Sequence, residues 1–252
     1  MLSIILSGAN GRMGRVIQEM VTHHEALTIV AGVDRHTGKT DFPIYQTLSE
    51  VNETADVVID FSHYSNVDTL LDASVEKQLP IVVATTGLTS EQFQAIDHAA
   101  TKIPVFYSAN MSLGINALIQ ALKTITPILE ADFDIEIIEK HHNQKKDAPS
   151  GTALLLADSI NETCREKKTY IYGRSGTENE NPRHELGIHA VRGGTIPGEH
   201  TVLYAGLDEL IELKHTALSR DIFANGALKA AQFLATQAPG RYSMEELIAT
   251  QS

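Results

Sequence analysis

The chain has 252 residues, a formal net charge of -12 and 42% hydrophobic content, which is enough for one large domain or two small ones. The acidic balance argues against nucleic acid as the main partner. No window approaches the length of a membrane span, and the first residues lack the basic segment of a signal peptide. With a single cysteine, Cys164, these features predict a reducing, cytoplasmic location.

The first half of the chain alternates apolar runs with helical patterns. An apolar strand over 3–7 precedes a glycine-rich turn and a helix to about residue 23. Further strands are predicted over 28–34, 57–62, 81–85 and 105–108, and helices over 66–77 and 90–101. Alternating helices and continuous apolar strands predict an α/β fold with a doubly wound parallel sheet. Such sheets bind ligands beyond the carboxyl ends of their strands.

The pattern changes in the second half. A long helix is predicted over 112–129, a strand over 132–140, a helix over 150–167 and a long mobile loop over 173–189. Three strands follow without intervening helices, over 188–192, 201–205 and 209–216, and a last helix over 221–235. This order predicts a smaller α+β unit with a mixed or antiparallel sheet.

The turn after the first strand carries three glycines in the sequence Gly8-Ala9-Asn10-Gly11-Arg12-Met13-Gly14. Glycine permits a tight turn and a close approach of the backbone to a pyrophosphate, which then faces the helix N-terminus. The spacing GxxGxxG is only moderately specific, but its place between a strand and a helix is that of a dinucleotide fingerprint. The first unit is therefore predicted to be Rossmann-like. A glycine-rich turn without a ligand is the alternative.

Asp34 ends the second predicted strand, and Arg35 follows it. A carboxylate at this point accepts hydrogen bonds from an adenosine ribose, whereas an arginine suits a 2′-phosphate. The pair predicts use of NADH and NADPH with no clear preference. Arg35 as a solvated surface charge is the alternative.

Other strand ends carry small and hydroxyl residues that leave room for a nicotinamide and offer it hydrogen bonds. Ordinary capping of the following helices is the competing interpretation. The segments are Asp60-Phe61-Ser62-His63, Ala84-Thr85-Thr86-Gly87 and Ser108-Ala109-Asn110-Met111.

The run HHNQKKDAPSGT, from His141 to Thr152, contains two imidazoles, two ammonium groups and a helix start. Histidine transfers protons near neutral pH, and lysine holds an anion or donates a proton. Ser150-Gly151-Thr152 after a proline predicts a helix N-terminus whose N–H groups suit a carboxylate or phosphate. The run predicts a pocket that binds and protonates a small anion.

Simpler interpretations of this run compete with that one. The two histidines could bind a metal with a later histidine or Asp147, but adjacent residues seldom reach one ion, so no metal is predicted. Lys145 and Lys146 could be solvated charges, an interpretation that is favoured for Lys146. Ser150 could serve only as a helix cap.

Together these segments resemble the 4-hydroxy-tetrahydrodipicolinate (dihydrodipicolinate) reductase family over essentially the whole chain. The resemblance rests on the glycine turn, on the strand ends at 60–62 and 84–87, and most specifically on the run from Glu139 to Ala153. Two later segments, RGGTIPGEHT at 192–201 and HTALSR at 215–220, also match.

The resemblance implies that NADH or NADPH delivers a hydride to 4-hydroxy-tetrahydrodipicolinate, giving tetrahydrodipicolinate and water in diaminopimelate and lysine biosynthesis. His141 would be the acid–base residue and Lys145 a proton donor, while His142, Gly151 and Thr152 would hold the cyclic dicarboxylate. The family also implies a dinucleotide-binding domain over 1–111 and 221–252, a substrate-binding and tetramerisation domain over 112–220, and a homotetramer.

The same resemblance implies which residues line the cofactor. They are Gly8, Ala9, Asn10, Gly11, Arg12, Met13, Asp34, Arg35, Ala84, Thr85, Thr86, Ser108, Ala109, Asn110 and Met111. Three of them depart from the family pattern: Ala84 replaces a glycine, Met111 stands where an aromatic residue is common, and Asp34 replaces the glutamate of some members.

Two other classes of protein stay open on the sequence. A relative of aspartate or homoserine dehydrogenase would share the glycine turn but would not need His141-His142 with Lys145. A dinucleotide-sensing regulator would favour a basic surface or a helix-turn-helix segment, and neither is apparent in the sequence.

Overall fold

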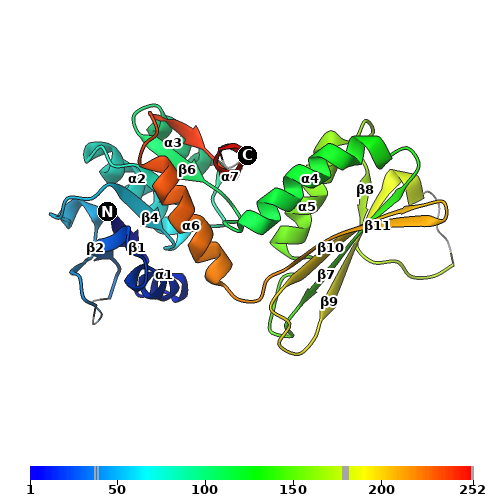
Figure 1. The fold of residues 1–252 in the computed structure, drawn as a ribbon, viewed down its shortest axis with the longest axis horizontal. Coiled ribbons are helices and arrows are strands. Elements are labelled where there is room, and N and C mark those ends of the chain that lie inside the picture. Colours follow the sequence, from blue (N-terminus) through cyan, green and yellow to red (C-terminus); the bar gives the residue numbers. More distant parts are fainter. Residues whose placement is uncertain (37, 39, 178–181, 251–252) are drawn as a thin grey trace. The chain divides into compact units, whose positions relative to one another are not determined.

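The computed structural model describes residues 1–36, 38, 40–177 and 182–250. The chain folds into two compact units, one formed by Met1–Leu113 with Arg220–Ser252 and the other by Gly114–Ser219. The first unit is therefore built from both ends of the sequence, as the blue and red ends of the ribbon in Figure 1 show.

The first unit contains a seven-stranded sheet with the strand order β12-β6-β5-β4-β1-β2-β3. All of its neighbouring strands run parallel. The strands are β1 (Leu2–Ser7), β2 (Leu27–Val33), β3 (Ile44–Tyr45), β4 (Val57–Asp60), β5 (Ile81–Val83), β6 (Pro104–Tyr107) and β12 (Gly240–Tyr242).

Helices cover both faces of this sheet, which explains why its strands are continuously apolar. In β1, Ile4 and Leu6 face one core and Ile5 faces the other, and all three are fully buried. The first core is completed by α1 (Arg12–Thr22), α6 (Asp221–Leu234) and α7 (Met244–Ala249), and the second by α2 (Val67–Glu76) and α3 (Ser90–Ala100).

The second unit has a five-stranded mixed sheet with the order β11-β10-β7-β9-β8. β7 pairs parallel with β9 and antiparallel with β10. The elements are α4 (Leu113–Leu129), β7 (Asp134–His141), α5 (Gly151–Thr163), β8 (Thr169–Ile171), β9 (Glu185–Arg192), β10 (Glu199–Gly206) and β11 (Glu209–Thr216).

One face of this second sheet packs against α4 and α5. β7 alternates strictly between half-buried and buried residues, so Ile135 and Ile137 reach the core while Glu136 lies on the opposite face. Glu139 and His141 continue the buried row of β7 toward its carboxyl end. The predicted fold, a doubly wound parallel sheet followed by an α+β unit with a mixed sheet, is confirmed.

Several predicted boundaries were wrong. The helix predicted over 150–167 ends at Thr163, where the Lys167 ammonium donates to the carbonyl of Asn161 at 2.8 Å, and β8 follows. The strands β3, β8 and β12 and the helix α7 were missed because each is short.

The loop predicted over 173–189 was also too long, and its residues 178–181 lie outside the described part. β9 already begins at Glu185. The polar residues of this segment were interpreted as a loop, but they lie on the outer face of the sheet, where a strand also carries polar side chains. There Arg174 pairs with Glu136 and Glu185, and His189 pairs with Glu136.

None of the helices in the described ranges combines the length and hydropathy needed to cross a membrane.

Candidate functional site

The glycine turn of the first unit has a geometry that side chains would disrupt. Gly8 has φ +77°, and a Cβ there would lie 2.7 Å from the carbonyl oxygen of Phe61. The amide of Gly11 donates to the carbonyl of Gly8 at 3.0 Å. Gly11 is also the N-cap of α1 and supplies no side-chain cap. The start of α1 therefore faces outward with backbone N–H groups, as an anion site requires.

Asp34 and Asn10 connect this turn to the end of β2. The Asp34 carboxylate accepts from the amide of Asn10 at 2.9 Å and from the amide of His36 at 3.2 Å. The Asn10 side chain donates to the carbonyl of His36 at 2.5 Å. A carboxylate has about four acceptor positions, so Asp34 keeps capacity for the hydroxyls of a ribose.

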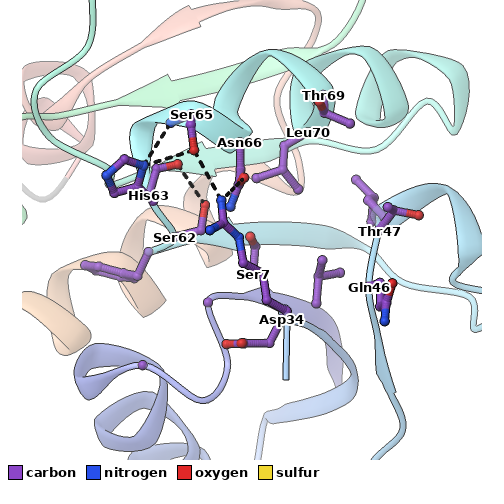
Figure 2. A pocket seen from close by; sticks show the side chains of 16 residues that line it. Ser7, Asp34, Gln46, Thr47, Ser62, His63, Ser65, Asn66, Thr69 and Leu70 are labelled. Atoms are coloured by element: carbon purple, nitrogen blue, oxygen red, sulfur yellow. Dashed lines mark hydrogen bonds between the residues drawn. The ribbon is translucent and has the colours of Figure 1, made fainter. Parts of the chain in front are cut away.

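A cavity of about 760 Å³ opens beside these residues. Figure 2 shows it between the loop at Gln46 and Thr47 and the segment Ser62–Asn66, with Asp34 at its edge. Its other lining residues are Ser7, Gly8, Gly11, Val33, Arg35, Leu48, Phe61, Thr69 and Leu70. A cavity of this size that is lined by both apolar and polar side chains, next to a glycine turn, suits a nucleoside.

Arg35 is exposed at the rim of this cavity. Its guanidinium donates to the Ser65 hydroxyl at 3.5 Å and to the Asn66 side chain at 3.4 Å, and His63 contacts the same hydroxyl at 3.0 Å. Hydrogen bonds this long are weak. Arg35 is therefore free to turn toward an anionic group without losing a strong partner.

The strand ends at 60–62 and 84–86 meet through a buried carboxylate. Asp60 is fully buried, accepts from the Thr85 hydroxyl at 2.7 Å and from the Ser62 amide at 2.9 Å. Ala84 and Thr85 are buried, whereas Thr86 is exposed. Thr86 is thus the residue of this segment whose side chain is open to a ligand.

The segment 108–111 has a similar division. The Ser108 hydroxyl donates to the carbonyl of Asn110 at 2.8 Å. Ala109 is exposed, but Asn110 and Met111 are buried, and the Met111 side chain lies in the core that α6 completes. Any contact of Met111 with a ligand would therefore be made by its backbone.

In the second unit, the buried carboxylate of Glu139 is the centre of a dense hydrogen-bond network. It has no exposed surface and accepts from His141 Nδ1 at 2.6 Å. Arg192 donates to its two oxygens at 2.7 Å each, and the Ser150 amide donates at 2.9 Å. Burial alone would raise the pKa of the Glu139 carboxyl, but these hydrogen bonds outweigh it and lower the pKa.

His141 is 8% exposed at the end of β7. Burial lowers the pKa of its imidazole, and the Lys145 and Arg192 cations add to that effect, while Glu139 opposes it. The result is a neutral imidazole near pH 7 whose Nδ1 faces an anion. Nε2 is left as the nitrogen available for proton transfer.

His200 lies beside His141 and holds the start of α5. The two rings meet edge to face with centroids 5.1 Å apart. His200 Nε2 lies 2.9 Å from the Ser150 hydroxyl, which accepts from the Ala153 amide at 3.1 Å and caps α5. Burial is the main cause that lowers the pKa of His200 to about 4, so this ring is neutral at physiological pH.

The two lysines of the run differ in their surroundings. Lys145 is half-buried, and its ammonium lies 2.9 Å from the Asp147 carboxylate. Lys146 is exposed. The Asp147 pKa is lowered: burial opposes the change, but hydrogen bonds from Lys145 and from backbone amides, including that of Gly151, outweigh it. The Asp147 carboxylate thus lies against Lys145, the predicted proton donor, and against the amide of Gly151, a group predicted to bind a substrate carboxylate.

Gly151 and Thr152 form the first turn of α5, where Gly151 is exposed and Thr152 half-buried. A Cβ on Gly151 would meet no atom within 4 Å. His142 is half-buried next to His141 in the chain. The loop after β9 runs along this segment, because the amide of Gly193 donates to the carbonyl of His141 at 2.9 Å.

All predicted cofactor residues therefore lie in the first unit, and all predicted catalytic and substrate residues lie in the second. Sequence reasoning gave no role to Glu139, Arg192 or His200. The alternation of β7 was a signal for Glu139, which must share a face with His141. Arg192 and His200 depend on sheet register, which pairs Arg192 with His141 and His200 with Glu139.

Within the described residues, no group of three or more His, Cys, Asp or Glu side chains is arranged to hold a metal ion. Cys164 is buried, and burial raises the pKa of its thiol to about 11, so it is a poor nucleophile.

Known protein families match both parts of the chain. The family "Dihydrodipicolinate reductase, N-terminus" matches residues 2–111, and "Dihydrodipicolinate reductase, C-terminus" matches residues 114–248. The 4-hydroxy-tetrahydrodipicolinate reductase of Caldanaerobacter subterraneus subsp. tengcongensis is 51% identical over 248 residues, 98% of each chain. That of Clostridium novyi is 49% identical over 249 residues, again 98% of each chain.

Two solved structures show the same fold. A dipicolinate-bound dihydrodipicolinate reductase from Paenisporosarcina sp. TG-14 has a TM-score of 0.82 at 24% identity, over 96% of this chain and 97% of that one. A scyllo-inositol dehydrogenase from Lactobacillus casei has a TM-score of 0.59 at 12% identity, over 98% and 93%.

The fold and the site define an oxidoreductase with a Rossmann-type unit and a separate α+β unit that carries a buried cluster of Glu139, His141 and Arg192. Both halves of the family match this chain, and relatives near 50% identity cover almost its whole length. These matches identify the family within the class of oxidoreductases. The chain belongs to the dihydrodipicolinate reductase family.

Proposed function

We propose that this protein reduces 4-hydroxy-tetrahydrodipicolinate to tetrahydrodipicolinate with NADH or NADPH, in diaminopimelate and lysine biosynthesis. The observation that carries the proposal is the joint attachment of His141 and the start of α5 to one buried carboxylate, Glu139. A proton-transfer nitrogen and a set of anion-binding amides are thereby held close together. A cyclic dicarboxylate that needs protonation fits both groups.

The first unit is the part proposed to bind the dinucleotide. Gly8 and Gly11 leave the backbone open at the start of α1, and the cavity edged by Asp34 and Arg35 has room for the adenosine portion. When bound, the reduced nicotinamide supplies the hydride that reduces C4 of the dehydrated ring. Thr86 and Ala109, exposed at the ends of their strands, are the side chains of that region best placed to contact a ligand.

The second unit is proposed to hold the substrate and move its protons. Each turnover takes up one hydride and one proton and releases one water. Elimination of water protonates the leaving hydroxyl and removes one proton from the ring, and the reduction then returns one proton to the ring. His141 Nε2 and Lys145 Nζ are the proposed donors. The amides of Gly151 and Thr152 would hold one carboxylate, with His142 as a further contact.

The outer face of the second sheet is the surface proposed for a homotetramer. Its strand β11 is an edge strand, and Leu210 there is 67% exposed while Val191 on β9 is 44% exposed. Both residues lie on the face of the sheet opposite α4 and α5, and the family resemblance is what supports this proposal. Light scattering on the purified protein tests this, and a monomer at micromolar concentration would contradict it.

The buried, unpaired Cys164 supports the proposed cytoplasmic location.

The activity is tested by following the oxidation of NADH and of NADPH with freshly generated 4-hydroxy-tetrahydrodipicolinate. We expect oxidation with both cofactors, dependent on the substrate. His141→Gln is the internal control, since it should be slow and should lose the pH dependence that His141 confers. If the wild-type protein oxidises neither cofactor, the proposed function is wrong.

A further inference from the structure

We propose that Glu139 is a positioning residue that serves both halves of the substrate site, orienting the acid–base nitrogen of His141 and fixing the first amides of α5. The inference rests on the proposed function for the identity of the substrate. The orientation of His141 and the anchoring of α5 by Glu139 do not depend on which substrate the protein binds.

Glu139 is fully buried and its acceptor positions are filled. One carboxylate oxygen accepts from His141 Nδ1 and from Arg192, and the other accepts from Arg192 and from the Ser150 amide, all within 2.6–2.9 Å. Four donors saturate a carboxylate. Glu139 is therefore a fixed acceptor that cannot reach a substrate, and it acts only through its partners.

The contact to His141 sets the tautomer of the ring. Because an ionised carboxylate only accepts hydrogen bonds, Nδ1 must carry a hydrogen and Nε2 must carry the lone pair in the neutral ring. The space beside Nε2 is kept by Gly198, where a Cβ would lie 3.2 Å from that nitrogen. The ring thus presents one defined nitrogen on the side where Gly198 carries no side chain.

The contact to Ser150 sets the position of the helix start. Ser150 is the N-cap of α5, so Gly151 and Thr152 are the first residues whose amides point out of the helix. Glu139 holds the Ser150 amide, and the Ser150 hydroxyl is held by His200 and the Ala153 amide. A shift of Glu139 would therefore move the proton-transfer nitrogen and the anion-binding amides together.

Arg192 is the counter-charge that keeps this arrangement balanced. The charged and titratable groups around His141 are Glu139 from its own strand, Arg192 from β9, His200 from β10 and Lys145 from the loop before α5. An unpaired buried glutamate would make the imidazole strongly basic and trap its proton. The bidentate pair with Arg192 limits that effect, so that His141 can both give and take a proton.

The first test needs no substrate and no variant of Glu139. In protein labelled with ¹⁵N-histidine, His141 should carry its hydrogen on Nδ1 at neutral pH, the tautomer that is less common in free histidine; His141→Gln assigns the signal. Hydrogen on Nε2 in the wild-type protein would overturn the proposal. This readout stands even if the wild-type protein fails the activity assay, so the two failures are distinguishable.

The second test is Glu139→Gln, which keeps the shape and removes the charge. We expect kcat to fall by about 10²-fold, the KM for reduced nicotinamide to stay within about twofold, and the pH-rate midpoint of His141 to move downward because its anion is gone. Binding of pyridine-2,6-dicarboxylate should also weaken. Glu139→Asp restores the charge, so its midpoint should return toward the wild-type value; it also serves if the glutamine variant does not fold.

Glu136→Gln is the matched control, because Glu136 lies on the same strand and also pairs with an arginine and a histidine, Arg174 and His189, on the outer face. It should leave kcat and the pH profile unchanged. A Glu139→Gln protein with wild-type kcat, or with reduced kcat but the wild-type tautomer and midpoint, would show that Glu139 only stabilises the fold and would overturn the proposal.

Discussion

The two units build their sites with different kinds of interaction. In the first unit the turn at Gly8 and Gly11 depends on the absence of side chains, and Arg35 is held only by contacts of 3.4–3.5 Å. In the second unit Glu139 binds four donors at 2.6–2.9 Å while fully buried. Sterics shape the first site and buried charge shapes the second. The first should therefore respond mainly to changes of size, and the second to changes of charge and pH.

The largest effect is expected at Lys145. Lys145→Ala removes a half-buried ammonium proposed to donate a proton, and kcat should fall by about 10²–10⁴-fold while NADH affinity, a property of the other unit, is kept. Steady-state kinetics and fluorescence titration with NADH measure the two. Lys146→Ala is the matched control, since Lys146 is exposed and should keep nearly full activity. Near-normal turnover by Lys145→Ala would contradict the role of this lysine.

In the first unit, the addition of a single methyl group at Gly8 should destabilise the fold. Gly8→Ala places a side chain at φ +77° and 2.7 Å from the Phe61 carbonyl oxygen. Gly87→Ala places one at φ +78° with no atom within 4 Å, so it isolates backbone strain of about 1–2 kcal/mol. Gly8→Ala should lose about 1–3 kcal/mol more from the clash and should weaken NADH binding. Denaturant titrations give the difference, and equal losses would show that the contact with Phe61 relaxes freely.

The stability of the second unit should depend on pH through His200. Its pKa is about 4 in the folded protein and about 6.5 when unfolded, so the unfolded state binds more protons below pH 6.5. The neutral His200 ring therefore contributes about 3 kcal/mol to the free energy of unfolding above pH 6.5, and this contribution is lost as the pH falls toward 4. His200→Gln should remove this part of the slope. The measurement is the difference in unfolding free energy between wild type and variant, and a pH-independent difference would contradict the assignment.

The smallest effect is expected for Arg35, which lies at the rim of the cavity of the first unit. Arg35→Ala should weaken NADPH by about tenfold, because a partly exposed charged hydrogen bond to a phosphate contributes about 1–2 kcal/mol. NADH should be little affected. Arg15→Ala on the exposed face of α1 is the matched control. Equal loss of affinity for both cofactors would refute a phosphate-specific role.

The same contrast explains how far the sequence predicts each site. The glycine turn was predictable because its geometry depends on residues within one strand–helix connection, and α5 was predictable from Ser150 and its cap. Arg192 and His200 were not, since the register of β9 and β10 with β7 brings them to Glu139 from 53 and 61 residues away along the chain. The cavity of the first unit likewise gathers Gln46, Ser65 and Leu70 from separate connections. A turn whose geometry depends on neighbouring residues can be predicted from the sequence, whereas a buried charge network can be predicted only once the pairing of the strands is known.

The division of the first unit between the two ends of the chain also orders events during synthesis. α6 supplies Ala224, Ala227, Ala230, Ala231 and Leu234, all without exposed surface, to one face of the parallel sheet. Until α6 and α7 have been synthesised, that face is covered only by α1, whereas residues 114–219 of the second unit precede both helices as one continuous segment. The cluster around Glu139 can thus assemble before the first unit is complete. A chain truncated after residue 220 and released from the ribosome should bury its second core and leave its first one open to proteases.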